Sequence, residues 1–313
     1  MRDPAALYEL RSTPPELSMP VLLVSLDGFV DAGSAARQAV THLFETCEYT
    51  ELATFDIDRL LDYRSRRPGM TFVDHEWTEY SEPKLALYQM WDRADTPFLL
   101  LTGLEPDREW EAFVAAVRQL VDRFGVELVV GFHGVPMAVP HTRPVTVTAH
   151  ATRTDLVPEE TTWPGRLQVP GSAEALLEYR LGQAGYDFIG YAIHVPSYLA
   201  QSEYPRCAIA ALSYVVTATQ LALSPEDMEP EALRTEEEIE KQVAASEEVQ
   251  RVVESLEEQY DSYMSARADL SGGDASSLLS ETGATSGPGL PSGDELGAAL
   301  ERYLAERDRG EES

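Results

Sequence analysis

The stretch Val21–Phe44 reads Val-Leu-Leu-Val-Ser-Leu, then Asp-Gly-Phe-Val-Asp-Ala-Gly-Ser, then Ala-Ala-Arg-Gln-Ala-Val-Thr-His-Leu-Phe. It opens on an apolar run without alternation, which is typical of a strand buried on both faces of a parallel sheet. Gly28 and Gly33 then predict a tight turn, and apolar residues recur at helical spacing as far as Phe44. Strand, turn and helix together form the first half of a βαβ unit.

The rest of the N-terminal two thirds repeats this alternation of strands and helices. Apolar or alternating runs predict strands over residues 47–57, 85–91, 97–102, 126–132, 145–148 and 186–195. Helical periodicity predicts helices over residues 107–124 (capped by Asp107 and ended by Gly125), 173–184 (capped by Ser172 and closed by Gly185) and 204–223. We therefore predict an α/β fold, with a mostly parallel central sheet flanked by helices.

The composition changes at Ser224, after which acidic residues dominate. We expect a core domain over residues 1–223 and an acidic helical arm over 224–270, with one long helix at 231–268. A flexible linker rich in Ser and Gly is expected over 271–293, followed by a short helix and tail over 294–313. A charged helix with one narrow apolar stripe must lie on another surface, because the stripe needs to be covered.

Charge and cysteine content narrow the classes of partner. The chain has 54 acidic and 24 basic residues, a net charge of −30, which predicts that it binds neither nucleic acid nor anionic membranes. Its two cysteines form no disulfide framework or metal motif. We see neither a signal-peptide pattern nor an apolar run long enough to cross a bilayer, and expect a cytoplasmic protein without a cofactor.

Glycine, aspartate and histidine gather at the ends of the predicted strands. Because ligands of open α/β sheets bind beyond the carboxyl ends of the strands, these ends could converge on one cleft. The candidate catalytic residues are then Asp27, Asp31, His133 and His194. The candidate ligand-binding residues are the glycines Gly28, Gly33, Gly131 and Gly134.

Each of these features also has a purely structural interpretation. Asp31 or Ser34 could cap the following helix, while Asp27 holds the turn. HExxH and GxSxG patterns are missing from the sequence, so we predict no metal site and no nucleophile elbow. The basic cluster Arg64, Arg66 and Arg67 could bind an anion, although such clusters are more often solvated loops.

One motif resembles that of a known family. The stretch from Leu26 to Ala36 is similar to the Gly-aromatic-x-Asp-Ala-Gly-x-Ala-Ala signature of the proteasome assembly chaperone family. The chain resembles most the long, acidic actinobacterial branch of that family, over residues 20–223 and again at Leu290–Leu296. The resemblance implies a phosphorylase/hydrolase-like α/β fold, a homo-oligomer such as a trimer, and proteasome subunits or another protein as partners.

Two functions follow. The favoured one is a non-catalytic interaction protein, a homo-oligomeric binding or assembly factor whose acidic arm packs on a neighbour or captures a partner. Some archaeal members dock through a C-terminal hydrophobic-Tyr-any tripeptide, but this sequence ends Glu311-Glu312-Ser313, which argues against that route. The alternative is a small-molecule hydrolase or phosphorylase-like enzyme that uses Asp27, Asp31 and His133.

Overall fold

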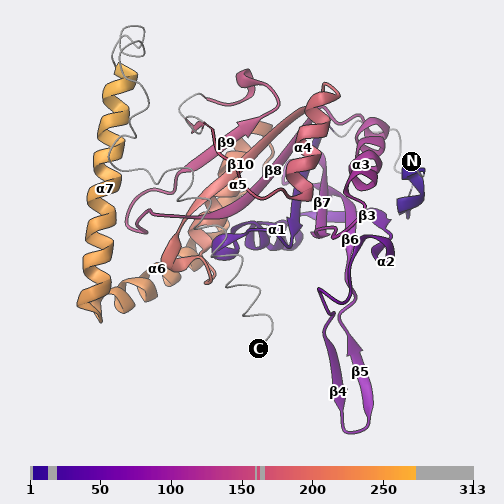
Figure 1. Cartoon of the computed structure of the whole chain (residues 1–313), viewed down its shortest axis with the longest axis horizontal. Helices are drawn as coiled ribbons and strands as arrows, with labels where there is room; N and C mark the ends of the chain where they lie inside the picture. The colour runs from indigo at the N-terminus through magenta and orange to yellow at the C-terminus, as the bar shows by residue number, and fades with distance from the viewer. Residues whose placement is uncertain (1–2, 13–19, 159–160, 163–165, 273–313) are drawn as a thin grey trace.

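The computed structural model describes residues 3–12, 20–158, 161–162 and 166–272 (Figure 1). Eight strands form one sheet in the order β1-β3-β6-β7-β2-β8-β10-β9. The four central strands are parallel to one another: β7 (Pro97–Leu104), β2 (Val21–Asp27), β8 (Leu128–Met137) and β10 (Asp187–Pro196). The strands outside them are antiparallel to their neighbours: β6 (Leu85–Trp91), β3 (Glu48–Phe55), β1 (Tyr8–Leu10) and β9 (Val147–Ala151).

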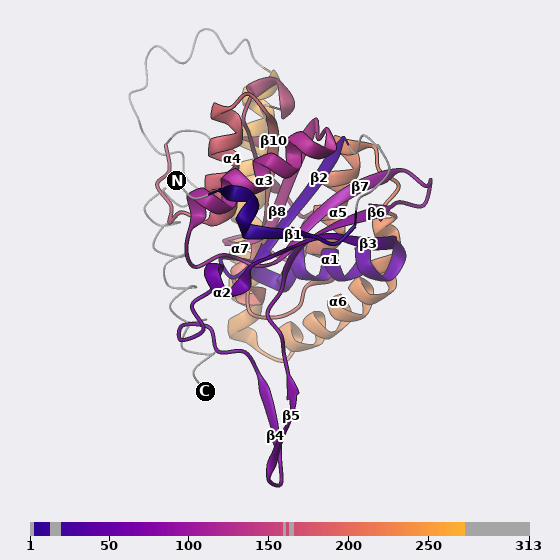
Figure 2. The same ribbon diagram turned by 90° about the vertical axis from the view of Figure 1, so that its right-hand side faces the viewer.

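Helices cover both faces of the sheet, which confirms the predicted fold class (Figures 1 and 2). On one face, α3 (Trp110–Phe124) and α4 (Ala173–Gln183) pack on the sheet through a core that includes Leu22, Phe113 and Phe188. On the other, α1 (Ala35–Thr46) and α5 (Pro205–Thr219) pack through a core that includes Leu23, Phe132 and Leu212. Because adjacent residues of β2 point to opposite faces, its apolar run contributes to both cores.

The ends of the helices follow the sequence in part. Ser172 caps α4 by accepting the N–H of Ala175 at 3.0 Å, and Gly125 ends α3 with a φ of 63°, as predicted. The prediction that Asp107 caps α3 was wrong. Its carboxylate instead accepts the N–H of Asp62 at 2.7 Å, and α3 begins after Glu109.

The acidic arm contains two helices rather than the one predicted over 231–268. Helix α6 (Glu229–Ala244) ends before α7 (Glu247–Gly272) begins. Arg206 of α5 holds α6 against the body, pairing with Glu229 and Glu236 at 2.7 Å each. Figure 1 shows α7 at one edge of the molecule. The predicted linker beyond residue 272 and the predicted helix at 294–313 lie outside the described residues.

An unpredicted β-hairpin projects from the body between α2 (Ile57–Leu60) and β6 (Figures 1 and 2). It consists of β4 (Met70–Val73) and β5 (Glu76–Tyr80), which pair only with each other. All of its residues are exposed. The described residues also form the short helices η1 (Pro4–Leu7), η2 (Ala32–Ser34), η3 (Thr154–Leu156), η5 (Ser197–Leu199) and η6 (Pro225–Met228).

Candidate functional site

Asp31 joins the first turn of α1 to the neighbouring strand β8. Its Oδ1 accepts the N–H groups of Ala36 at 2.9 Å and Gly134 at 3.0 Å, and its Oδ2 accepts that of Arg37 at 3.0 Å. Ser34 makes no side-chain cap. Burial raises the pKa of Asp31, while the three hydrogen bonds oppose that rise. Asp31 therefore caps α1, as its structural interpretation predicted.

We expect Asp31→Ala to destabilise the fold by about 2 kcal/mol, because it removes a helix cap and leaves the Gly134 N–H without its acceptor. Asp31→Asn retains one acceptor oxygen and should lose less. Thermal unfolding of the two variants beside the unaltered chain measures the difference. Equal stability of all three would show that these hydrogen bonds contribute nothing.

Asp27 points away from this network. Its side chain is 59% exposed and lies 4.0 Å from the guanidinium of Arg37. Its backbone carbonyl accepts the N–H of Glu105 at 2.8 Å, which ties the end of β2 to the end of β7. Arg66 lies over Gly28 and pairs with Asp107 at 2.8 Å, so the solvated-loop interpretation was wrong for this member of the basic cluster.

The four candidate glycines are sites of close approach. A Cβ on Gly131 would lie 2.4 Å from Oε1 of Glu174, and one on Gly134 would lie 2.1 Å from the carbonyl oxygen of Ala32. Gly28 and Gly33 lie in the turn after β2, both with positive φ, as the sequence predicts. A side chain at Gly134 would collide with backbone, whereas one at Gly131 would displace the carboxyl group of Glu174.

A cavity of about 370 Å³ opens at the carboxyl ends of β2, β8 and β10, beside α4. Its walls are mainly apolar and include Leu26, Phe29, Val30, Val135, Met137 and Val169. His133 of β8 and His194 of β10 both line it, so the structure brings these two candidates together. Asp27 and Asp31 instead line a smaller neighbouring cavity of about 230 Å³, which His133 also borders.

The histidines of the larger cavity differ in their partners. Two threonines hold His194, with Thr146 at 2.8 Å from Nδ1 and Thr148 at 2.8 Å from Nε2. His133 makes no hydrogen bond through its ring within the described part of the chain. Burial, with a smaller effect from the charge of His150, lowers the pKa of His133 to about 4. The ring is therefore neutral at pH 7.

Three carboxyl groups that the sequence did not single out line the same cavity. Glu178 pairs with His150 at 2.8 Å, and Glu105 accepts the N–H of Ala173 at 2.6 Å. Glu174 accepts a backbone N–H from Leu26, yet burial first and then the charges of Glu178 and Glu105 raise its pKa well above the usual range. Glu174 and Glu178 lie in the first two turns of α4, where acidic residues are ordinary, and Glu105 lies in the loop after β7, so the sequence carried no signal for them.

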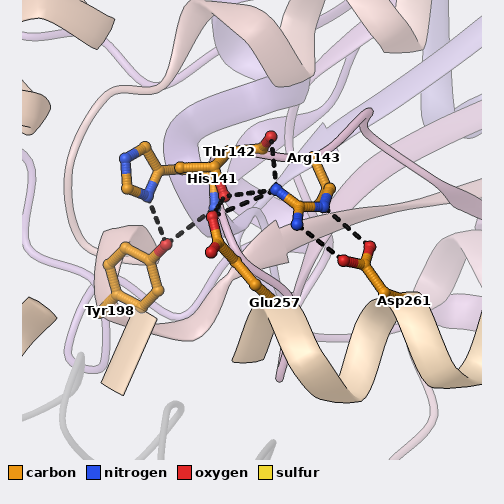
Figure 3. A network of polar contacts seen from close by, with 6 residues as sticks. All are labelled: His141, Thr142, Arg143, Tyr198, Glu257 and Asp261. Atoms are coloured by element: carbon orange, nitrogen blue, oxygen red, sulfur yellow. Dashed lines mark hydrogen bonds and ion pairs between the residues drawn. The ribbon is translucent and has the colours of Figure 1, made fainter. Parts of the chain in front are cut away.

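The arm attaches to the body through the segment that follows β8 (Figure 3). Arg143, between β8 and β9, forms a two-pronged pair with Asp261 of α7, at 2.8 Å from Nε and 2.7 Å from Nη2. Its Nη1 also lies 3.2 Å from Glu257. Tyr198 contacts His141 through its hydroxyl, 2.7 Å from Nδ1. Arg143 therefore holds α7 beside the segment that follows β8.

The described residues contain neither a metal-binding cluster nor a membrane-spanning helix. In the ranges that the structure describes, no group of three or more His, Cys, Asp or Glu side chains is arranged to hold a metal ion. Across those same ranges, every helix is too short or too polar to cross a membrane. The cavity itself offers imidazoles, carboxyl groups and apolar walls.

The fold and the cavity define an α/β protein with an apolar cavity at the carboxyl ends of its parallel strands. The chain belongs to the PAC2 family, whose sequence profile matches residues 25–243. This confirms the family suggested by the motif after β2. A search of curated proteins gave no match.

Solved structures give close matches. A Mycobacterium tuberculosis protein of unknown function, Rv2714, is 43% identical, with 96% of each chain covered and a TM-score of 0.81. A Corynebacterium glutamicum protein of unknown function is 39% identical over 82% of this chain and 98% of its own, with a TM-score of 0.79. The M. tuberculosis proteasome-assembly chaperone homologue Rv2125 is 25% identical over 74% and 99%, with a TM-score of 0.68.

Proposed function

We propose that this protein is a homo-oligomeric binding factor with a role like that of proteasome assembly chaperones. The family assignment and the similarity to a proteasome-assembly chaperone homologue support the class of function. The projecting β4–β5 hairpin is the observation that supports self-association. The match to Rv2714 over 96% of both chains supports placing the protein in the long actinobacterial branch.

The hairpin exposes a group of large apolar side chains. Phe72 and Trp77 meet edge to face, with ring centroids 5.0 Å apart, and Trp77 remains 63% exposed. Met70, Val73 and Tyr80 are about half exposed beside them. Two-stranded hairpins are marginally stable alone, and contiguous exposed apolar patches typically mark interaction sites. A second copy of the chain, which packs on this patch in the assembled oligomer, is the partner we propose.

Sedimentation velocity of the full chain tests this proposal. We expect a mass of several chains for the unaltered protein, and a shift to single chains for the double variant Phe72→Ser/Trp77→Ser, whose side chains the body does not bury. Tyr179→Ser, on the exposed side of α4, is the matched control and should leave the mass unchanged. A single-chain mass for the unaltered protein, or an unchanged mass for the double variant, would contradict self-association through the hairpin.

A second experiment tests whether the protein binds proteasome subunits. Purified proteasome α subunits from the same organism, mixed with the full chain, should form a complex that co-migrates in size-exclusion chromatography. Bovine serum albumin at equal concentration serves as the control protein. Separate elution of the two proteins at micromolar concentration would overturn the proteasome-related role and leave the self-association result unaffected.

A further inference from the structure

The 370 Å³ cavity has a charge pattern that selects for one kind of ligand. Glu105, Glu174 and Glu178 line it together with three histidines, and the residues described along its walls include no Lys or Arg. We propose that this cavity binds a small molecule with an apolar body and one amine, which is held as an ammonium ion by Glu174. The inference is independent of the hairpin and of any proteasome partner.

The volume and the apolar walls of the cavity determine the size and the apolar character of the ligand that fits it. Small-molecule sites typically enclose ~300–1,000 Å³ and have apolar walls with a few convergent polar groups. This cavity lies near the lower end of that range, and its walls come from the turn after β2, the last residues of β8 and the segment before α4. A compact ring or a short alkyl chain fits that volume and those walls.

Glu174 lines the cavity and can meet a bound cation. Its carboxyl group lies against β8, where Gly131 leaves the space for it, and it accepts the N–H of Leu26. The charges of Glu105, Glu178 and Asp31 act on it, and the ring of His133 lines the cavity on the strand beside it. No hydrogen bond within the described residues occupies that ring, so its nitrogen is available to a ligand N–H.

These surroundings exclude the opposite ligand charge. An anion would meet three carboxyl groups, and the guanidinium of Arg66, which lies 4.0 Å from Glu105, is already paired with Asp107. An ammonium ion favours the ionised form of Glu174 and turns a neutral contact into a charge-assisted hydrogen bond, which is about twice as strong. Binding of the ammonium therefore releases the Glu174 proton, and affinity rises with pH until that group ionises in the free protein.

Three compounds of similar size test the proposal on the unaltered chain by titration calorimetry. We expect 2-phenylethylamine to bind about tenfold more tightly than 2-phenylethanol. We expect 3-phenylpropanoate to give no measurable binding. The affinity of the amine should increase between pH 5 and pH 7, and that of the alcohol should not. Equal affinities for amine and alcohol, or tighter binding of the carboxylate, would overturn the proposal.

Glu174→Gln identifies the group responsible, since glutamine keeps the acceptor for Leu26 and cannot ionise. We expect the variant to bind the amine about tenfold more weakly, at the level of the alcohol, and without pH dependence. Glu45→Gln, an exposed change on α1, is the matched control and should leave all affinities unchanged. Unchanged amine binding by Glu174→Gln would contradict the assignment. The three-compound comparison still decides the ligand class if that variant does not fold.

Discussion

Gly134→Ala is expected to lower the free energy of unfolding by on the order of 3 kcal/mol, because it forces a methyl group against a backbone carbonyl. The Cβ would lie 2.1 Å from the oxygen of Ala32 and 3.1 Å from its carbon. That carbonyl belongs to the buried turn between β2 and α1 and is not a flexible side chain. Moving β8 away from the Ala32 carbonyl to make room for the methyl group would also strain the hydrogen bond from the Gly134 N–H to Asp31.

Urea-induced unfolding measures this loss, and Gly171→Ala supplies a matched control. Nothing lies within 4 Å of a Cβ at Gly171, and its φ is not positive. Alanine there should leave stability unchanged or raise it by about 0.5 kcal/mol, since it restricts the unfolded chain. If the two variants unfold at the same urea concentration, the close contact between β8 and the turn after β2 is not present in solution.

The predicted elements and the missed hairpin differ in what stabilises them. Strand β2 is buried on both faces and helix α3 on one. Both were predicted because burial imposes an apolar pattern on the sequence. The β4–β5 hairpin is exposed on both faces, so no pattern of burial marks it. The break between α6 and α7 was missed because Ala245 and Ser246, the two residues between the helices, include no proline or glycine that would mark a helix end.

The sequence could predict only those residues of the candidate site that lie at the ends of strands. His133 and His194 lie at the carboxyl ends of neighbouring parallel strands, which the topology rule brings to one edge. Glu174 and Glu178 reach the same cavity because α4 crosses that edge, which depends on how the helix packs on the sheet. In the sequence, Asp31 could be either a catalytic carboxylate or a helix cap. Only its three backbone hydrogen-bond donors identified it as a cap.

Acid is expected to destabilise this protein through His133. Burial lowers the pKa of His133 from 6.5 to about 4, so the folded chain keeps the ring neutral where the unfolded chain protonates it. Between pH 6.5 and 4 the unfolded state therefore binds more protons, and stability falls as the pH decreases. The shift corresponds to roughly 3 kcal/mol, fully lost by about pH 4. Glu174 acts in the opposite direction, because its raised pKa keeps a proton in the fold that the unfolded chain loses.

Comparison with His133→Asn separates the histidine from the other titrating groups. Asparagine is polar and does not titrate here, so the difference in unfolding free energy between the two proteins should change by roughly 3 kcal/mol from pH 7 to pH 4. His75→Asn, in the exposed turn of the hairpin, is the matched control and should show no such change. Parallel pH profiles for the unaltered chain and His133→Asn would show that the ring is hydrated, and that the cavity beside it is open to water rather than enclosed.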